Sequence, residues 1–272
     1  MLREEYPVRV VCEVMNCSRS SYYYRAQVQD ETTLKQAIAE VVAEWPRYGY
    51  RRVTKQLQRQ GWSVNHKRIH RLMAEMKLLI KRKRRKKQTT NSRHSYGRYP
   101  NLLDNLEIIR PDQVWVADIT HIRLPQGAAY LAVIMDSFTR NIRGWHLGRG
   151  LDLSLTLTAL KHALKKGSPE IHHSDQGLQY AAADYVALLQ KHDTQISMAE
   201  VGAAWQNGSA ERLIRTIKEE EVDLSDYQDY HHAYAQLRHF LNHRYPNERI
   251  HSALDYLTPA EFEQLWYQNH AF

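Results

Sequence analysis

Hydrophobic positions recur with two different periods along this chain, and the period changes near Pro111. Before that residue, apolar side chains recur every three or four positions, which predicts helices. A short N-terminal helical segment is expected within residues 1–30, followed by a three-helix unit at residues 31–80. Breakers and a cap stand where the helices of that unit should end or begin: Pro46, Gly61 and Asn65.

Beyond Pro111 the pattern becomes that of an α/β domain. Three runs rich in β-branched, aromatic and apolar residues predict an antiparallel meander: 114–122, 129–138 and 142–147. Helices and short strands then alternate: 153–165, 170–174, 181–191, 194–198 and 204–222, followed by helices at 230–243 and 259–266. This order predicts a mixed five-stranded sheet flanked by helices, which is the ribonuclease H-like arrangement.

Charge divides the chain at the same place. The net charge of the 272 residues is +8, but residues 1–110 hold 24 Lys and Arg against 10 Asp and Glu, whereas residues 111–272 hold 14 against 20. This asymmetry indicates that the first part binds a polyanion and the second binds cations. We therefore expect these units: a helix-turn-helix domain at 31–80, a basic linker at 81–110, a ribonuclease H-like core at 111–225 and C-terminal helices at 226–272.

Several classes of protein are disfavoured by composition. No apolar run is long enough for a transmembrane helix, and the charged N-terminus lacks a signal-peptide core, so we expect a cytoplasmic protein without a membrane partner. The two cysteines, Cys12 and Cys17, are too few for a disulfide framework. A zinc site that combines them with His66 and His70 is disfavoured because no second Cys pair is present.

The third helix of the 31–80 unit is basic on its exposed side, where it carries His66, Lys67, Arg68, His70 and Arg71. Two short helices joined by a turn, with the second rich in basic groups, are typical of a DNA-binding helix-turn-helix. The alternative is a three-helix bundle with a solvated basic face. Seven consecutive cations follow, which repel one another and are expected to become ordered against phosphate: Lys81, Arg82, Lys83, Arg84, Arg85, Lys86 and Lys87.

Three carboxylates stand out in the second part of the chain. Asp118 lies within an otherwise apolar strand, where an unpaired charge is costly and requires a partner or a metal. Asp175 ends the fourth strand, which pairs beside the first in a ribonuclease H-like sheet. Glu211 lies at the edge of the apolar stripe of the 204–222 helix, with Arg215 and Lys218 on the same flank. By itself this helix also fits an ordinary amphipathic helix with a Glu–Arg pair.

A sheet of this topology brings the two aspartates together, and the helix that packs across it delivers the glutamate. Carboxylates held this close repel one another, and a divalent cation removes that repulsion. Hard oxygen ligands favour Mg²⁺ or Mn²⁺, and two such ions clamp the entering and leaving oxygens of a phosphoryl displacement.

The sequence blocks around these acids carry a family resemblance. Residues 115–120 (WVADIT), 173–180 (HSDQGLQY) and 207–220 resemble the three catalytic blocks of bacterial insertion-sequence transposases, in particular the orfB type of the IS-three group. These belong to the retroviral integrase superfamily with a DDE catalytic core. The remaining similar segments are 48–52 and 65–73, which look like the family's upstream helix-turn-helix, and 249–254 and 258–262, which look like its C-terminal signature.

The resemblance implies a DNA transposase that cleaves at insertion-sequence ends and transfers the freed 3′-hydroxyl into target DNA. Asp118, Asp175 and Glu211 would be catalytic and would hold two Mg²⁺ or Mn²⁺ ions. Lys218, Arg215 and the seven cations would contact DNA phosphates. The implied partners are terminal inverted repeats, target DNA, further copies of the chain on DNA, and an upstream-frame product or fusion. A nucleoid-associated location follows from these partners.

The chain departs from the family at two places, and other acids and histidines compete for a role. Gln206-Asn207-Gly208 replaces the common Asp-Asn-Ala, and His121, which has no assigned role, replaces a common Tyr. We interpret Asp136 as structural, Glu219–Glu221 as solvated, and His172 and His173 as packing or supporting residues. Two other functions remain open: a ribonuclease H-like nuclease without strand transfer, and a catalytically inactive DNA-binding regulator.

Overall fold

The computed structural model describes residues 6–24, 30–80, 99–200 and 202–270. The seven consecutive cations at 81–87 lie outside these residues, so their predicted DNA contacts stay a prediction. Within the described part of the chain, no helix is both long and apolar enough to span a bilayer.

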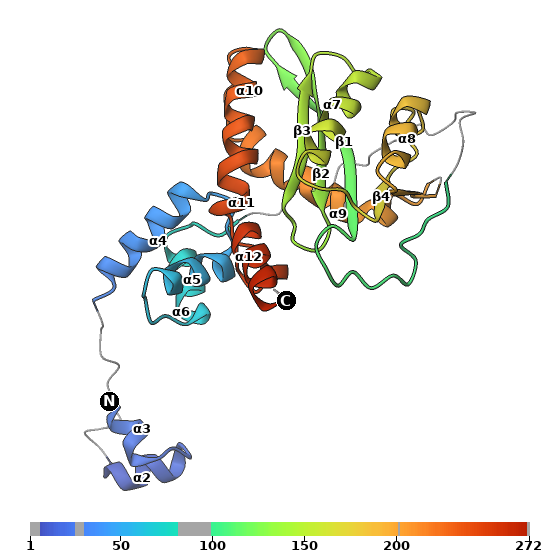
Figure 1. The fold of residues 1–272 in the computed structure, drawn as a ribbon. Coiled ribbons are helices and arrows are strands. Elements are labelled where there is room, and N and C mark those ends of the chain that lie inside the picture. The colour runs from blue at the N-terminus through green and yellow to red at the C-terminus, as the bar shows by residue number, and fades with distance from the viewer. Residues whose placement is uncertain (1–5, 25–29, 81–98, 201, 271–272) are drawn as a thin grey trace.

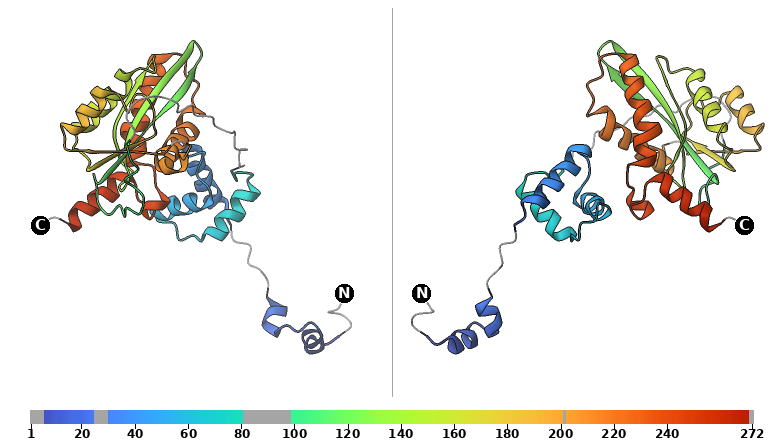
Figure 2. Two further views of the ribbon diagram at one scale, coloured as in Figure 1. Left: turned by 90° about the vertical axis from the view of Figure 1, so that its right-hand side faces the viewer. Right: turned by 60° about the vertical axis from the view of Figure 1, so that its left-hand side comes forward.

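The first part of the chain is helical, as predicted. A pair of short helices, α2 (Val8–Val14) and α3 (Arg19–Tyr23), lies apart from the rest of the chain (Figures 1 and 2). The three-helix unit consists of α4 (Thr32–Glu44), α5 (Tyr50–Arg59) and α6 (His66–Glu75). The Asn65 side chain accepts a hydrogen bond from the backbone N–H of Lys67 and so caps α6. The fully buried residues of the unit are those that gave the helical period: Ile38, Val53, Leu57, Ile69, Leu72 and Met73.

The second part contains one five-stranded sheet with the order β3-β2-β1-β4-β5. Its strands are β1 (Val114–Leu124), β2 (Gly127–Asp136), β3 (Ile142–Gly148), β4 (Ile171–Ser174) and β5 (Gln195–Met198). The β1–β2 and β2–β3 pairs are antiparallel, and the β1–β4 and β4–β5 pairs are parallel. The predicted mixed sheet, with its fourth strand beside the first, is confirmed.

Each face of the sheet is covered by helices (Figure 1). Alternate residues of β1 point to opposite faces, so Val114 and Val116 contact one apolar core while Trp115 and Ala117 contact the other. The second core is closed by α7 (Leu153–Leu164) and α8 (Ala183–Gln190). The first is closed by α9 (Gly208–Ile217), α10 (Tyr230–His239), a π-helical continuation η3 (Phe240–Arg244) and α11 (Tyr245–Asn247).

The catalytic-block helix expected at 204–222 is not uniform. It begins as a 3₁₀ turn, η1 (Ala204–Asn207), continues as α9, and ends as a π-helix, η2 (Lys218–Val222). A π-helix takes more residues per turn than an α-helix, so side chains after Lys218 rotate away from the positions that an α-helix predicts.

Part of the segment expected to be a linker lies on the core instead. Leu102, Leu106 and Ile108 pack against the first apolar core, and the backbone N–H of Leu102 donates to the Ser197 hydroxyl over 2.9 Å. Residues 99–110 therefore help to cover the first apolar core, whose side chains would otherwise face water.

The C-terminal residues join the helix-turn-helix unit to the sheet domain. Ile250 is fully buried within the core of the three-helix unit, and its backbone N–H donates to the Tyr48 hydroxyl over 2.9 Å. The Arg244 guanidinium lies 4.3 Å from the centre of the Trp45 ring and donates to the Glu44 carbonyl. The last helix, α12 (Pro259–Asn269), starts with a capping box formed by Thr258 and Glu261.

Candidate active site and nucleic-acid interface

The parallel pairing of β1 with β4 places two aspartates at corresponding positions. Val116 is paired with His173, and Asp118 and Asp175 each follow their paired residue by two positions. Both therefore share the strand parity of Val116, whose side chain faces the core that α9 and α10 close. The topology brings the two acids to one face of the sheet, at the end of β4.

Electrostatic interactions link these acids to α9. Burial, followed by the charge of Asp175, raises the pKa of Asp118 to about 7, and the charge of Glu211 acts in the same direction. The backbone N–H of Ile119 donates to Asp118 Oδ1 over 2.8 Å and lowers the pKa, as does the charge of Lys218. Asp118, Asp175, Glu211 and Lys218 are therefore neighbours, and negative charge predominates among them.

Asn207 fixes the start of α9 against β1. Its side-chain Nδ2 donates to the carbonyl oxygen of Ala117 over 3.0 Å, and the residue is only 4% exposed. Asn207 and Ser209 both have side chains that could cap a helix, but neither makes a capping hydrogen bond to α9. Instead, Asn207 holds the helix beside the residue that precedes Asp118. Glu211 follows one helical turn later on the same flank.

The donor chemistry of this cluster fits a divalent cation, because three carboxylates supply hard oxygens and repel one another. In the conformation described, however, no group of three His, Cys, Asp or Glu side chains within the described residues is placed to hold one ion. Joint coordination by Asp118, Asp175 and Glu211 therefore requires a local shift of at least one of them.

Aromatic and imidazole groups pack beneath the aspartates. The Tyr180 hydroxyl is buried and has no hydrogen-bond partner among the described residues, and burial raises its pKa. His172 Nε2 lies 3.0 Å from the Tyr185 hydroxyl, and His173 Nδ1 lies 2.8 Å from the Ser197 hydroxyl. Burial lowers the pKa of His172 to about 3 and that of His173 to about 4, so both rings are neutral. Such contacts are those of packing residues.

The expectation for Glu219–Glu221 was wrong for two of the three residues. Glu219 is exposed, but Glu220 makes a bidentate ion pair with Arg249, with distances of 2.6 and 2.7 Å. Glu221 is buried and accepts hydrogen bonds from Ser225 and Tyr227. The π-helical η2 is the physical reason, since it turns these carboxylates inward where an α-helix would expose them.

Asp136 has the contacts of a structural residue. It is fully buried and accepts hydrogen bonds from the backbone N–H groups of Asp112, Phe138 and Thr139. The Arg143 guanidinium lies 3.6 Å away. These bonds hold the β2–β3 turn closed, on a part of the sheet separate from Asp118.

The predicted DNA contacts fall into two groups in the structure. Arg215 is exposed and Lys218 half-buried on the flank of α9 that carries Glu211. On α6, Lys67 is exposed, but Arg68 and Arg71 both pair with Glu31, at 2.9 and 2.7 Å. Both arginines of α6 therefore form ion pairs with Glu31, the residue that precedes α4.

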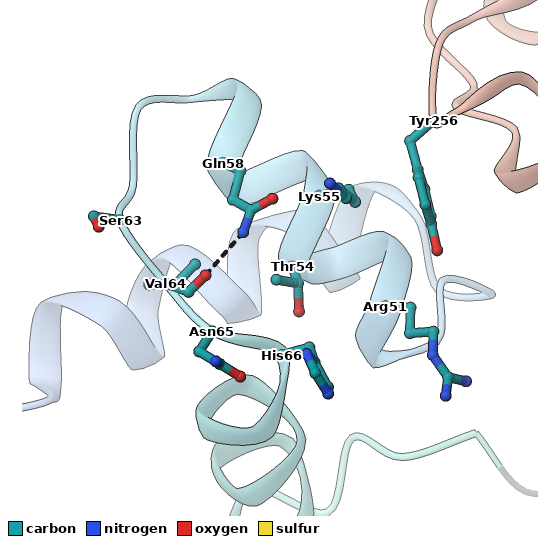
Figure 3. A pocket seen from close by; sticks show the side chains of 9 residues that line it. All are labelled: Arg51, Thr54, Lys55, Gln58, Ser63, Val64, Asn65, His66 and Tyr256. Atoms are coloured by element: carbon teal, nitrogen blue, oxygen red, sulfur yellow. Dashed lines mark hydrogen bonds between the residues drawn. The ribbon is translucent and has the colours of Figure 1, made fainter.

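A groove of about 590 Å³ lies on the helix-turn-helix unit (Figure 3). Its wall includes α5, the turn closed by a hydrogen bond from Gln58 to the Val64 carbonyl, and the start of α6. The ammonium of Lys55 lies 5.5 Å from the ring centre of Tyr256, which comes from the C-terminal segment. The lining residues are Arg51, Thr54, Lys55, Gln58, Ser63, Val64, Asn65, His66 and Tyr256.

Sequence reasoning missed this groove, although part of it was visible. Arg51 and Lys55 stand at i and i+4 on α5, which predicts a shared basic flank. Tyr256 had no such signal, because it reaches the groove from about 200 positions away. It follows Asp255, and both residues have positive φ angles of 49° and 64°, a conformation that costs free energy in non-glycine residues.

Comparison with known proteins agrees with this architecture. Residues 109–204 and 192–259 match family models described as an integrase core domain, and residues 29–87 match one described as an HTH-like domain. The chain is 33% identical to the "Insertion element IS600 uncharacterized 31 kDa protein" of Shigella sonnei, covering 95% of this chain and 99% of the relative. It is 32% identical to the "Transposase for insertion sequence element IS904" of Lactococcus lactis, covering 80% and 88%.

A solved structure shares the fold. The intasome of simian T-cell lymphotropic virus, determined in complex with the PP2A regulatory subunit B56 gamma, aligns with a TM-score of 0.50 and 15% identity, over 83% of this chain and 74% of that one. The sheet and its flanking helices thus define a ribonuclease H-like integrase core. With the sequence relatives, this means that the chain belongs to the insertion-sequence transposase family of the IS-three group, whose members are polynucleotidyl transferases.

Proposed function

We propose that this chain is a DNA transposase that cleaves DNA at insertion-sequence ends and joins the freed 3′-hydroxyls to target DNA. The observation that carries the proposal is the cluster of Asp118, Asp175 and Glu211 at one face of an integrase-type sheet, where burial and then the charges of Asp175 and Glu211 raise the pKa of Asp118. A half-buried cluster of like charges is costly to the fold and is typical of a catalytic site.

The three carboxylates would be the ligands of two Mg²⁺ or Mn²⁺ ions. When bound, these ions would activate the attacking hydroxyl and stabilise the leaving oxygen of an in-line phosphoryl displacement. The chain itself supplies position and charge: Asn207 holds α9 against β1, and Lys218 offers a cation beside the acids. Arg215, on the same flank, would bind the DNA backbone as it approaches.

DNA is the proposed partner of the helix-turn-helix unit. Arg51, Lys55 and His66 line its groove, and the exposed Lys67 follows on α6, so phosphates would meet several donors on one surface. Terminal repeats and target DNA would therefore be the substrates. We also propose that several copies assemble on DNA and that an upstream-frame product contributes to activity. The viral relative of known structure is itself an intasome.

A strand-transfer assay tests the proposal. Labelled DNA carrying the ends that flank this gene would be incubated with the full chain, a supercoiled plasmid and Mg²⁺ or Mn²⁺. We expect labelled DNA joined covalently to the plasmid, with no joined product from Asp118→Asn or Glu211→Gln. Cleavage without joining would identify a nuclease instead. DNA retention without any chemistry, unchanged in Asp118→Asn, would identify a regulator.

A further inference from the structure

A small cavity of about 100 Å³ lies on a different flank of α9 from the acids. Ser209, Arg212 and Thr216 recur at helical spacing along that flank, whereas Glu211, Arg215 and Lys218 follow another. The remaining walls come from α5, the β2–β3 turn, α11 and the segment around η4 (Ser252–Leu254). Four of the lining side chains are arginines: Arg52, Arg140, Arg212 and Arg249.

The charge of these arginines is only partly neutralised. Glu220 pairs with Arg249 at 2.6 Å and with Arg52 at 3.5 Å. Across the described ranges of the chain, no carboxylate forms an ion pair with Arg140 or Arg212. Arg140, which is half-buried, donates instead to the Ser209 hydroxyl over 3.2 Å. Glu220 thus neutralises part of the charge of Arg249 and Arg52, whereas Arg140 and Arg212 have no carboxylate at ion-pair distance among the described residues.

Burial, together with the positive charge of the cavity, lowers the pKa of several lining groups. Burial, with a further contribution from Arg212, lowers the pKa of Arg140, and burial followed by the charge of Arg249 lowers the pKa of Arg52. Burial and the charges of Arg249, Arg52 and Arg140 lower the pKa of His251 to about 2, so this ring is neutral. Arg212 is exposed, but Arg140 is half-buried, and an uncompensated guanidinium group that is partly removed from water destabilises the fold unless an anion joins it.

We propose that this cavity binds one phosphate group of the DNA backbone, and the proposal rests on the proposed function. Guanidinium groups present paired N–H donors that match phosphate oxygens, and the hydroxyls of Ser209, Thr216 and Ser252 add further donors. The cavity touches α5 of the helix-turn-helix unit and the residue after Glu211. A strand held there would run between the DNA-binding unit and the acids.

The test measures binding of the full chain to duplex DNA without divalent metal, so it is independent of catalysis. The slope of log affinity against log salt becomes shallower by about 0.9 for each duplex phosphate that the protein no longer neutralises. We expect this decrease in both Arg140→Gln and Arg212→Gln. Arg238→Gln, which removes an exposed arginine of α10 outside the cavity, is the charge-matched control and should leave the slope unchanged.

Thermal unfolding distinguishes weakened phosphate binding from damage to the fold. Arg140→Gln should melt at the same temperature as the wild type or higher, because it relieves repulsion with Arg212. A second arm adds inorganic phosphate, which should raise the melting temperature of the wild type more than that of Arg140→Gln.

Two outcomes would overturn the assignment. If the phosphate effect disappears in the variants while their DNA salt slopes match the control, the cavity binds a free anion and not DNA. If neither quantity changes, the cavity binds no phosphate. A wild-type chain that binds no duplex DNA at all would instead defeat the proposed function, whereas loss of strand transfer with intact salt slopes would leave this inference standing.

Discussion

The two flanks of α9 carry opposite and incompletely neutralised charge. On one flank, Glu211 adds its charge to that of Asp118 and Asp175. On the other, Arg212 and Arg140 share a cavity with Arg52 and Arg249, and Glu220 pairs with the latter two. A single helix of ten residues thus separates a surplus of negative charge from a surplus of positive charge.

The like charges gathered on each flank of α9 repel one another and so lower the stability of the fold. Arg143, by contrast, is buried and paired: it lies 2.8 Å from Asp112 and 2.6 Å from Glu263. Like charges that are gathered at one place repel one another, and a ligand of the opposite sign removes that repulsion. The acidic flank thus suits cations, and the arginine flank suits phosphate.

The largest effect is expected from neutralising the acidic flank. Asp118→Asn should lower cleavage and joining by about 1000-fold or more, which corresponds to ~4 kcal/mol of transition-state stabilisation. Product yields from end-labelled DNA would measure it. Asp226→Asn, which changes an exposed aspartate far from the sheet acids in sequence, is the control and should retain full activity. An active Asp118→Asn enzyme would contradict the proposed role.

The second-largest effect is expected from breaking the ion pair between Glu220 and Arg249, beside the arginine flank. Glu220→Gln leaves the Arg249 guanidinium, 2% exposed, without a neutralising charge, which should cost about 3 kcal/mol of folding free energy. Denaturant unfolding would measure this cost. Glu219→Gln is a matched control on the adjacent residue, and because Glu219 is exposed it should change stability by less than about 0.5 kcal/mol. Equal effects of the two variants would show that Glu220 is not a buried partner.

The two flanks also differ in how much of their structure could be predicted from the sequence. The acidic flank was predictable, because strand parity and the order of elements place Asp118 beside Asp175, and the helical period puts Glu211 at the edge of the apolar stripe. Local spacing determines all three positions once the topology is known.

The arginine flank was not predictable in the same way. Its residues come from segments that lie up to about 200 positions apart, and no local period connects Arg52 with Arg140 or Arg249. The burial of Glu220 was also missed, because it depends on a π-helix that apolar periodicity does not reveal. Tyr256 reaches its groove through two left-handed residues, which a sequence without glycine there gives no reason to expect.

The pH dependence of stability offers a separate measure of the acidic flank. Since the folded-state pKa of Asp118 is raised to about 7 from an ordinary value of 3.8, the folded chain holds a proton that the unfolded chain releases. Stability should therefore fall as pH rises from about 4 to about 7 and level off above that, by ~2 kcal/mol after allowance for solvent screening.

Unfolding of wild type and Asp118→Asn across this pH range would measure the effect. The difference between the two proteins should grow with pH, and Mg²⁺ at pH 8 should stabilise the wild type more than the variant. Parallel pH profiles for the two proteins would show that Asp118 is not the titrating group.

The smallest effect concerns the hydrogen bond that joins the flanks to the sheet. Asn207→Ala removes the donor to the Ala117 carbonyl, which should cost ~1 kcal/mol of folding free energy. Because the bond also fixes the start of α9, strand joining should fall by more than stability alone explains, while the salt slope of DNA binding stays at the wild-type value. Ser209→Ala is the comparison on the opposite flank, because it removes the hydrogen bond that Arg140 donates. In this variant the salt slope of DNA binding should become shallower, while strand joining at saturating DNA should change less than in Asn207→Ala. If the two variants gave the same pattern, the two flanks of α9 would not act as separate sites.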